Sequence, residues 1–600
     1  MPNNKKFDER GDIIYGNIQP KVSLNTPDLT DIGKTIVSDK FPITTDSFWF
    51  ALDTDVIVNP FDFVTVGNVR NTKTIGIVKE LQTVAIDSHY YYSLLQDLKE
   101  ERKEERKEEH TPFHSTRNLL NSAQIRPIYE ITVAKVAIMG NTGVKIDGTK
   151  NSISISMPLR SNRPVRFATA PEIMFALGTP EMGNPIPAGV IQATNGLQVP
   201  ITLDISYLAG PDTAHVNVSG ISGNQKTSYL LFLLQSAYQK LKDQNVAVII
   251  FNTKQGELLQ IDKKQKDVKE RTEKLFDILD LDIQPFENVT YFLPRGRDGR
   301  PNSGYIPKNA KTYSYELRDV YDRLELLLPD AYDPQYNLAS IIDYVYEAWP
   351  LTDASGKKIK TWTDLFGFKN YPKTIVSHKS SVLHFRSYLQ RFRKSSMFID
   401  RKVTSMYLGK QIKKIKSNDV FVIDVGMVSS LAEQSFIVGD VMKSIDEMYS
   451  TTNGYDDQEK ESNGNNKNKK NDNKKTKPDY ILVFVDEINR FLPKLQSAGR
   501  MGAVAEQIMK TLIAGRSRGT ILFSAQQFKS ATDLRLHENT GLHIIAKLGL
   551  SELSAEPYSM IDESTKNNIV RLNKGELVMT HTAFRHPIKI AFPKATFKKP

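Results

Sequence analysis

The sequence predicts an α/β protein in which a parallel sheet follows a small antiparallel β-barrel. Between about residues 32 and 177, short aromatic and β-branched runs such as "DSFWFALD" and "FDFVTVGNV" alternate with Asn, Pro and Gly, a pattern typical of barrel strands. From about Pro200, a strand, a glycine-containing loop and a helical pattern follow one another, and then comes "NVAVIIFNTKQGELL", a continuous apolar run that ends in polar residues. That order is typical of a parallel sheet covered by helices.

The composition excludes several classes of protein. The 600 residues are 40% hydrophobic and 25% charged, which is ordinary usage for a globular chain of several domains. The 80 basic and 69 acidic residues give a net charge of +11, which permits a polyanionic partner. The absence of cysteine excludes disulfides, thiolate zinc sites and cysteine nucleophiles.

Changes in composition and in the pattern of apolar residues divide the chain into segments. We expect a flexible N-terminus over residues 1–30 and the barrel over 31–180, interrupted by a charged insertion at 98–111. The parallel-sheet core is expected in two parts, 181–262 and 412–600, with a mostly helical insertion over 263–411 between them. Residues 453–479 contain almost no apolar side chain, so the sequence predicts a disordered loop there.

The segment "GISGNQKTS", which begins at Gly220, has the features of a phosphate-binding loop. Such a loop needs backbone N–H groups at a helix N-terminus, a lysine for the phosphate oxygens and a hydroxyl group for Mg²⁺. We therefore assign nucleotide binding to Gly220, Gly223, Asn224, Gln225, Lys226, Thr227 and Ser228. The strict pattern has glycine where this chain has Gln225, which leaves an ordinary strand–loop–helix turn as the alternative.

Two carboxylates end a later apolar strand, "YILVFVDE". Asp486 and Glu487 follow five apolar residues, and adjacent acids at the end of a buried strand are costly unless they have a function. In a P-loop ATPase, the Asp orients Mg²⁺ and the Glu polarises the attacking water. The alternative is a strand end whose acids reach solvent.

A third element is "AGRSRGTILFSAQQ", in which two arginines precede a strand that ends near Gln526. A cation presented to a neighbouring γ-phosphate stabilises charge in the transition state, and an amide at a strand end can sense that phosphate. Arg516 and Arg518 are the two candidates for the cation. In isolation, two surface arginines and a capping glutamine would explain the segment equally well.

Together these motifs resemble the HerA family of hexameric ATPases, relatives of the FtsK DNA pumps. The resemblance covers most of the chain, from the barrel, which is similar to the family's HAS domain, to the closing "LNKGELVMTHTAFRHPIKIAFP". It implies a RecA-like P-loop NTPase core that uses ATP and Mg²⁺. The implied roles are phosphate and Mg²⁺ binding by Lys226 and Thr227, metal support by Asp486, catalytic base for Glu487, arginine finger for Arg516 with Arg518 as its rival, and sensor for Gln526.

The resemblance also implies what the chain does. Its members form homohexamers that move DNA. They work with a NurA-like nuclease in DNA-end resection or, in the bacterial anti-phage branch, beside an effector that is a nuclease or a sirtuin-type NADase. We therefore expect a ring-forming, ATP-dependent DNA translocase or helicase.

Two other functions stay open. One is a scaffold ring that binds nucleotide, hydrolyses it weakly and regulates an effector; Gln225 favours it. The other is a conjugation-type coupling ATPase, against which the lack of an evident membrane anchor argues. No apolar run of about 18 residues and no secretory signal is evident in the sequence, so we expect no membrane anchor and a cytoplasmic location.

Overall fold

The computed structural model describes residues 6–7, 13–14, 30–85, 130–145, 152–153, 156–179, 182–208, 214–221, 223, 225–328, 337–372, 379–400, 406–450, 477–494 and 501–598. The predicted charged insertion at 98–111 lies outside these residues, as does the polar loop 453–479 except for residues 477–479. In the region expected to be a flexible N-terminus, β1 (Lys6–Phe7) pairs antiparallel with β2 (Ile13–Ile14). The described residues divide into two compact units. The smaller unit lies within residues 23–177 and 192–198, and the larger unit lies within 1–22, 178–191 and 199–600.

The smaller unit is the predicted antiparallel barrel. Its strands close in the order β10-β3-β4-β7-β6-β5, and side chains such as Phe48, Phe50, Val64 and Val136 fill its interior without exposure to solvent. The strands are β3 (Asp31–Ile36), β4 (Ser47–Leu52), β5 (Phe63–Gly67), β6 (Lys73–Ala85), β7 (Glu130–Asn141) and β10 (Pro164–Phe167). Helix α2 (Ala170–Ala176) and the short pair β8 (Val144–Lys145) and β9 (Ser152–Ile153) complete this unit.

The larger unit is built on a twelve-stranded sheet among the described residues. Its order is β12-β11-β22-β21-β20-β13-β19-β18-β14-β17-β15-β16. The bounds are β11 (Pro185–Gln192), β12 (Gln198–Asp204), β13 (Val216–Ser219), β14 (Val246–Asn252), β15 (Val289–Pro294), β16 (Ala310–Tyr313), β17 (Val420–Asp424), β18 (Tyr480–Val485), β19 (Thr520–Gln526), β20 (Leu542–Ile545), β21 (Glu576–His581) and β22 (Ile588–Ala591). The strands from β20 to β16 are parallel, and β21 and β22 extend the sheet antiparallel.

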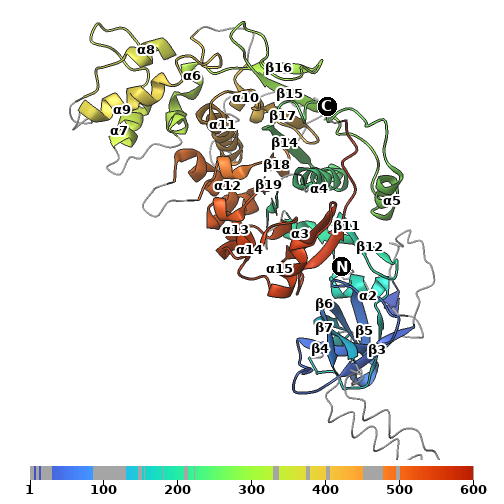
Figure 1. The fold of residues 1–600 in the computed structure, drawn as a ribbon. Coiled ribbons are helices and arrows are strands. Elements are labelled where there is room, and N and C mark those ends of the chain that lie inside the picture. Colours follow the sequence, from blue (N-terminus) through green and yellow to red (C-terminus); the bar gives the residue numbers. More distant parts are fainter. Residues whose placement is uncertain are drawn as a thin grey trace, which may run out of the picture. The chain divides into compact units, whose positions relative to one another are not determined.

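Helices cover both faces of the parallel part. Helix α4 (Lys226–Lys240) lies on one side of the strands, and α11 (Leu431–Ser450) and α12 (Ala503–Arg518) lie on the other (Figure 1). Every residue of β14 and β19 is buried, as expected for strands covered on both faces. The fold is therefore of the α/β class, with a parallel sheet covered by helices on both faces and, earlier in the sequence, a closed antiparallel barrel, as the sequence predicted.

The remaining helices are short. They are α3 (Ile205–Leu208), α5 (Glu270–Ile278), α6 (Leu317–Val320), α7 (Asn337–Glu347), α8 (Trp362–Gly367), α9 (Lys379–Gln390), α10 (Leu408–Ile412), α13 (Leu534–Glu538), α14 (Leu550–Leu553) and α15 (Glu563–Val570). Among the described residues, no helix combines the length and apolar character needed to cross a membrane.

The range 263–411, expected to be a mostly helical insertion, also contributes to the sheet. β15 and β16 lie in this range and form one edge of the parallel part, with β15 paired to β17. β15 ends in a proline, which argues against a strand in a sequence, and two of the four residues of β16 are polar, which explains why the sequence did not reveal them. The insertion therefore begins with helix α5, continues as an extension of the sheet and is helical from α6 onward.

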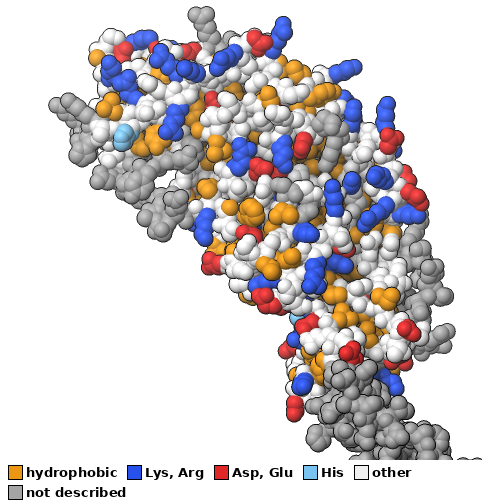
Figure 2. Space-filling model, in the orientation of Figure 1, with side chains coloured by type: hydrophobic (Ala, Val, Ile, Leu, Met, Phe, Trp, Pro, Cys, Tyr) orange, Lys and Arg blue, Asp and Glu red, His pale blue; other side chains and the backbone are white. Residues whose placement is uncertain are grey.

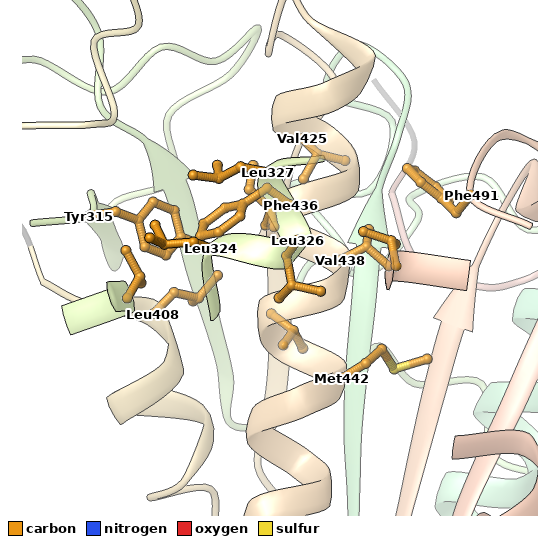
Figure 3. Close-up of a cluster of buried hydrophobic side chains, with 14 of the residues drawn as sticks. Tyr315, Leu324, Leu326, Leu327, Leu408, Val425, Phe436, Val438, Met442 and Phe491 are labelled. Carbon is orange, nitrogen blue, oxygen red and sulfur yellow. The ribbon is translucent and has the colours of Figure 1, made fainter. Parts of the chain in front are cut away.

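A single apolar core joins these helices to the sheet. Side chains of β14, β17 and β18 on one face pack with those of α11, α12 and the helical segment 317–328, and Figure 3 shows the part around α11. The Phe436 ring lies at its centre, 5.0 Å from the Tyr315 ring and 5.3 Å from the Phe398 ring in edge-on contacts. This packing fixes α11 against the strands that carry the polar residues described below.

We expect Phe436→Ala to lower the free energy of unfolding by about 3–5 kcal/mol, because it removes a fully buried ring and leaves a cavity. Denaturant unfolding measures this loss. The control is Leu431→Ala, at the first position of the same helix, where the side chain is 45% exposed and the expected change is within about 0.5 kcal/mol. Equal losses in the two variants would contradict the assignment of Phe436 to the core.

Candidate nucleotide-binding site

The predicted site residues gather at one edge of the parallel sheet. β13, β14, β18 and β19 run in the same direction, so their carboxyl ends lie at the same edge, which is where ligands bind in open α/β sheets. Gly220 follows β13, Asp486 follows β18, and Gln526 ends β19. β19 lies between the other two strands, so the amide of Gln526 stands between the loop and the carboxylates.

A cavity of about 500 Å³ lies at this edge. Predicted residues from three segments line it: Gly223, Gln225, Lys226, Thr227, Ser228, Asp486, Glu487 and Gln526. Ser222 and Asn224 lie outside the described residues. The structure thus brings together, around one cavity, the cation and the acids that lie far apart in the sequence.

The loop before α4 has two unusual backbone positions. Gly220 has φ +152°, and a Cβ atom there would lie 2.6 Å from the Cβ of Ala546, so only glycine fits. Gln225 has φ 61° and ψ 22°, the left-handed region that favours glycine. The departure of this chain from the strict motif therefore falls at a position where a glycine would avoid backbone strain.

Lys226 and Thr227 begin α4, whose N-terminal N–H groups and dipole favour an anion. The Nζ of Lys226 donates a hydrogen bond of 3.1 Å to the carbonyl oxygen of Ile221, which holds the ammonium group over the loop. Burial lowers the pKa of Lys226, and the nearby charge of Asp486 opposes that shift.

The carboxylate of Asp486 joins three segments. Its Oδ2 accepts hydrogen bonds from the Thr227 hydroxyl group at 2.9 Å and from the Lys254 ammonium group at 2.8 Å. Its Oδ1 accepts the backbone N–H of Glu487 at 2.9 Å. With a side chain only 5% exposed, Asp486 is shielded from water, so these bonds are stronger than surface contacts.

Sequence reasoning did not assign Lys254 to the site. Burial acts to lower the pKa of Lys254, but the charge and hydrogen bond of Asp486 outweigh it, so the pKa lies above its ordinary value. Lys254 follows the end of β14 by two residues, and that position is the signal that could have found it.

The donor set suits Mg²⁺. The Thr227 hydroxyl and the Asp486 carboxylate are oxygen ligands of the kind that Mg²⁺ prefers, and they lie 2.9 Å apart beside a lysine and a helix N-terminus, which suit phosphate groups. Among the described residues, no cluster of three or more His, Asp or Glu side chains forms an all-protein metal site.

Glu487 begins the 3₁₀-helix η6 (Ile488–Arg490) with φ 54° and ψ 49°. This left-handed turn directs the chain away from β18 and leaves the Glu487 side chain on the cavity wall. The Arg490 guanidinium group lies 4.0 Å from the Glu487 carboxylate and donates a 2.7 Å hydrogen bond to the side-chain oxygen of Gln434. Glu487 is thus positioned by a turn and a weak ion pair.

Gln526 is fully buried and its amide is already engaged. Its Oε1 accepts a hydrogen bond from the Asn217 side chain at 2.8 Å, and its Nε2 donates to the Asn217 oxygen at 2.7 Å. Asn217 was not predicted, although a polar residue inside the apolar strand "VNVS" was a signal for it. The amide pair couples the strand before the loop directly to the predicted sensor.

The two candidate arginines lie at the C-terminal end of α12. Arg518 forms an ion pair with Asp446 of α11, which engages it within its own chain. This disfavours Arg518 as a residue presented to a neighbouring subunit. The side chain of Arg516 lies outside the described residues, so its role as the finger stays a prediction.

No protein-family model matches this chain, and no curated protein is significantly similar to it. Among solved structures, the chain is similar to VirB4 of Thermoanaerobacter pseudethanolicus, at 14% identity, with 68% of this chain and 96% of that chain covered and a TM-score of 0.41. It is also similar to the bacterial conjugative coupling protein TrwBdeltaN70, at 12% identity, 68% and 90% coverage and a TM-score of 0.38.

A third likeness, to the genome packaging NTPase B204 from Sulfolobus turreted icosahedral virus 2, covers 31% of this chain and 74% of that chain, at 10% identity and a TM-score of 0.21.

A buried lysine lies close to the loop. Lys529, which is 2% exposed, places its Nζ 3.0 Å from Nδ1 of His543 and 5.3 Å from the Tyr558 ring centre. The Tyr558 hydroxyl donates a 3.0 Å hydrogen bond to Ser219, the residue before Gly220. Burial lowers the pKa of Lys529 to about 7, and attraction to Glu552 opposes this.

This shift predicts a pH dependence of stability. Between pH 7 and the ordinary lysine pKa near 10.4, unfolded Lys529 binds a proton that folded Lys529 does not. The free energy of unfolding therefore increases as the pH rises through that window, by up to about 1.4 kcal/mol per pH unit from this group. Denaturant unfolding at several pH values measures this slope.

Lys529→Met is expected to reduce the slope, because it removes the titrating group. The control is Lys494→Met. Lys494 is exposed and lines the same surface hollow as Lys529, so this change should leave the slope unchanged. An unaltered slope in Lys529→Met would contradict the lowered pKa.

Proposed function

We propose that this chain binds and hydrolyses ATP at the carboxyl edge of its parallel sheet. The observation that carries the proposal is the 2.9 Å hydrogen bond from Thr227 to Asp486 beside Lys226, at a cavity of about 500 Å³. It supports a nucleotide site because a hydroxyl, a carboxylate and a lysine then meet at a helix N-terminus, as a phosphate–Mg²⁺ group requires.

Each residue has a distinct role in this proposal. Lys226 and the N–H groups of the loop bind the phosphate oxygens, and Thr227 and Asp486 hold Mg²⁺, which when bound neutralises phosphate charge. Glu487 orients and polarises the attacking water. Gln526 senses the terminal phosphate, for which it must exchange its hydrogen bonds with Asn217.

We further propose that the chain forms a ring, a homohexamer, which moves along DNA. Arg516 then supplies a cation to the site of a neighbouring subunit, where it stabilises charge in the transition state. The net charge of +11 supports a sequence-independent attraction to the phosphate backbone of DNA. By its resemblance to the HerA family, the ring would act with a nuclease or a sirtuin-type NADase, in DNA processing or anti-phage defence.

A second candidate is a scaffold ring that binds nucleotide, hydrolyses it poorly and regulates an effector. The observation that favours it is Gln225, whose left-handed backbone and side chain lie on the cavity wall where the strict motif has glycine. Turnover in the presence of DNA distinguishes the two functions.

We expect ATP hydrolysis that duplex DNA stimulates, and a loss of about 10²–10⁴-fold in Glu487→Gln, because this change removes the base but keeps the shape of the side chain. Phosphate release with and without DNA measures turnover, and calorimetry shows whether the variant still binds ATP. The control is Glu563→Gln, at a glutamate whose side chain is 80% exposed. Nucleotide binding without turnover in the parent chain would favour the scaffold, and full activity in Glu487→Gln would contradict the role of Glu487.

A further inference from the structure

The last described residues of the chain form a strap across the helix that begins the nucleotide site. After β22, the Phe592 ring packs edge-on against the Tyr229 ring of α4, with centroids 5.0 Å apart. Further along, the carbonyl oxygen of Thr596 accepts a hydrogen bond from the backbone N–H of Gln265 at 2.9 Å. The backbone N–H of Lys598 donates to the carbonyl oxygen of Lys263 at 2.7 Å. We call residues 592–598 the C-terminal strap.

The apolar residues of the strap are buried against the protein, whereas its two lysines are exposed at the cavity. Phe592, Ala595 and Phe597 are buried, and the Thr596 hydroxyl accepts a 3.1 Å hydrogen bond from Gln235 of α4. Lys594 and Lys598 are exposed, and both line the cavity that holds Lys226 and Asp486. The strap therefore places two ammonium groups on a wall of the cavity. Residues 592–598 contain no Asp or Glu that could neutralise them.

The charges around the cavity fit a highly charged anion. Five lysines line it, Lys226, Lys254, Lys574, Lys594 and Lys598, against three acids, Glu257, Asp486 and Glu487. Within the described part of the chain, Lys254 is paired with Asp486, whereas no ion pair engages the two strap lysines. On the face drawn in Figure 2, Lys and Arg side chains are spread over the surface, whereas lysines outnumber acids among the residues that line the cavity.

We propose that Lys594 and Lys598 bind the phosphate chain of the nucleoside triphosphate, so that the C-terminal strap forms a second cationic wall of the nucleotide site. This rests on the proposed binding of ATP at the same cavity. The loop precedes α4, and the strap packs against Tyr229 and Gln235 of the same helix. The strap lysines then add attraction that grows with the number of phosphate charges. The site then selects triphosphates over nucleotides with fewer phosphates.

Calorimetric titration of the full chain with Mg·ATP tests the proposal. The double variant Lys594→Gln and Lys598→Gln is expected to bind ATP about tenfold more weakly, because two charge-assisted contacts are lost. The affinity for AMP, which has one phosphate, should fall less than the affinity for ATP. Lys594→Arg and Lys598→Arg, which keep the charge, should bind ATP as the parent does. The matched control, Lys394→Gln and Lys414→Gln, changes two exposed lysines outside the cavity and should have no effect.

Lysine acetylation read by mass spectrometry tests the unaltered chain. Mg·ATP should protect Lys594 and Lys598 but leave Lys394 and Lys414 reactive. Unchanged affinity in the glutamine variant, equal acetylation with and without ATP, or protection by duplex DNA in place of ATP would overturn the proposal. If the parent chain binds no ATP, the proposed function itself fails; if it binds ATP and the strap variants do so equally well, only the role of the strap fails.

Discussion

The hydrogen bond between the Thr227 hydroxyl and the Asp486 carboxylate is the contact on which the site depends. It joins two residues 259 positions apart and ties the first turn of α4 to the end of β18. Lys254 meets the same oxygen from a third segment, at 2.8 Å. Because Asp486 is nearly inaccessible to solvent, loss of one partner would leave a poorly compensated charge in a shielded place.

The sheet makes this contact possible. Its order puts β19 between β13 and β18, so the loop and the carboxylates stand two strands apart with the amide of Gln526 between them. The paired amides of Asn217 and Gln526 then connect the strand before the loop with the predicted sensor. The apolar core around Phe436 packs against β14, β17 and β18. The C-terminal strap packs against α4.

Much of this arrangement could be predicted from the sequence, for reasons that are physical. Buried parallel strands appear as continuous apolar runs, so the strands that precede the loop, the carboxylates and Gln526 were evident, as was the barrel. β15 and the edge strand β16 were missed because β15 ends in a proline and two of the four residues of β16 are polar. Asn217 and Lys254 carried local signals, but their roles come from contacts with Gln526 and Asp486, which lie 309 and 232 positions away in the sequence. The strap lysines were missed because their place at the cavity comes from tertiary packing alone.

The central claim is that Thr227 and Asp486 act together on one metal–nucleotide group. A double-mutant cycle with Thr227→Val and Asp486→Asn tests it most directly, with Mg²⁺-dependent ATP affinity measured by calorimetry. If both residues hold the same ion, the second substitution adds little to the first, and the coupling energy is about 1 kcal/mol or more. Additive losses, or an ATP affinity that does not depend on Mg²⁺, would contradict the account.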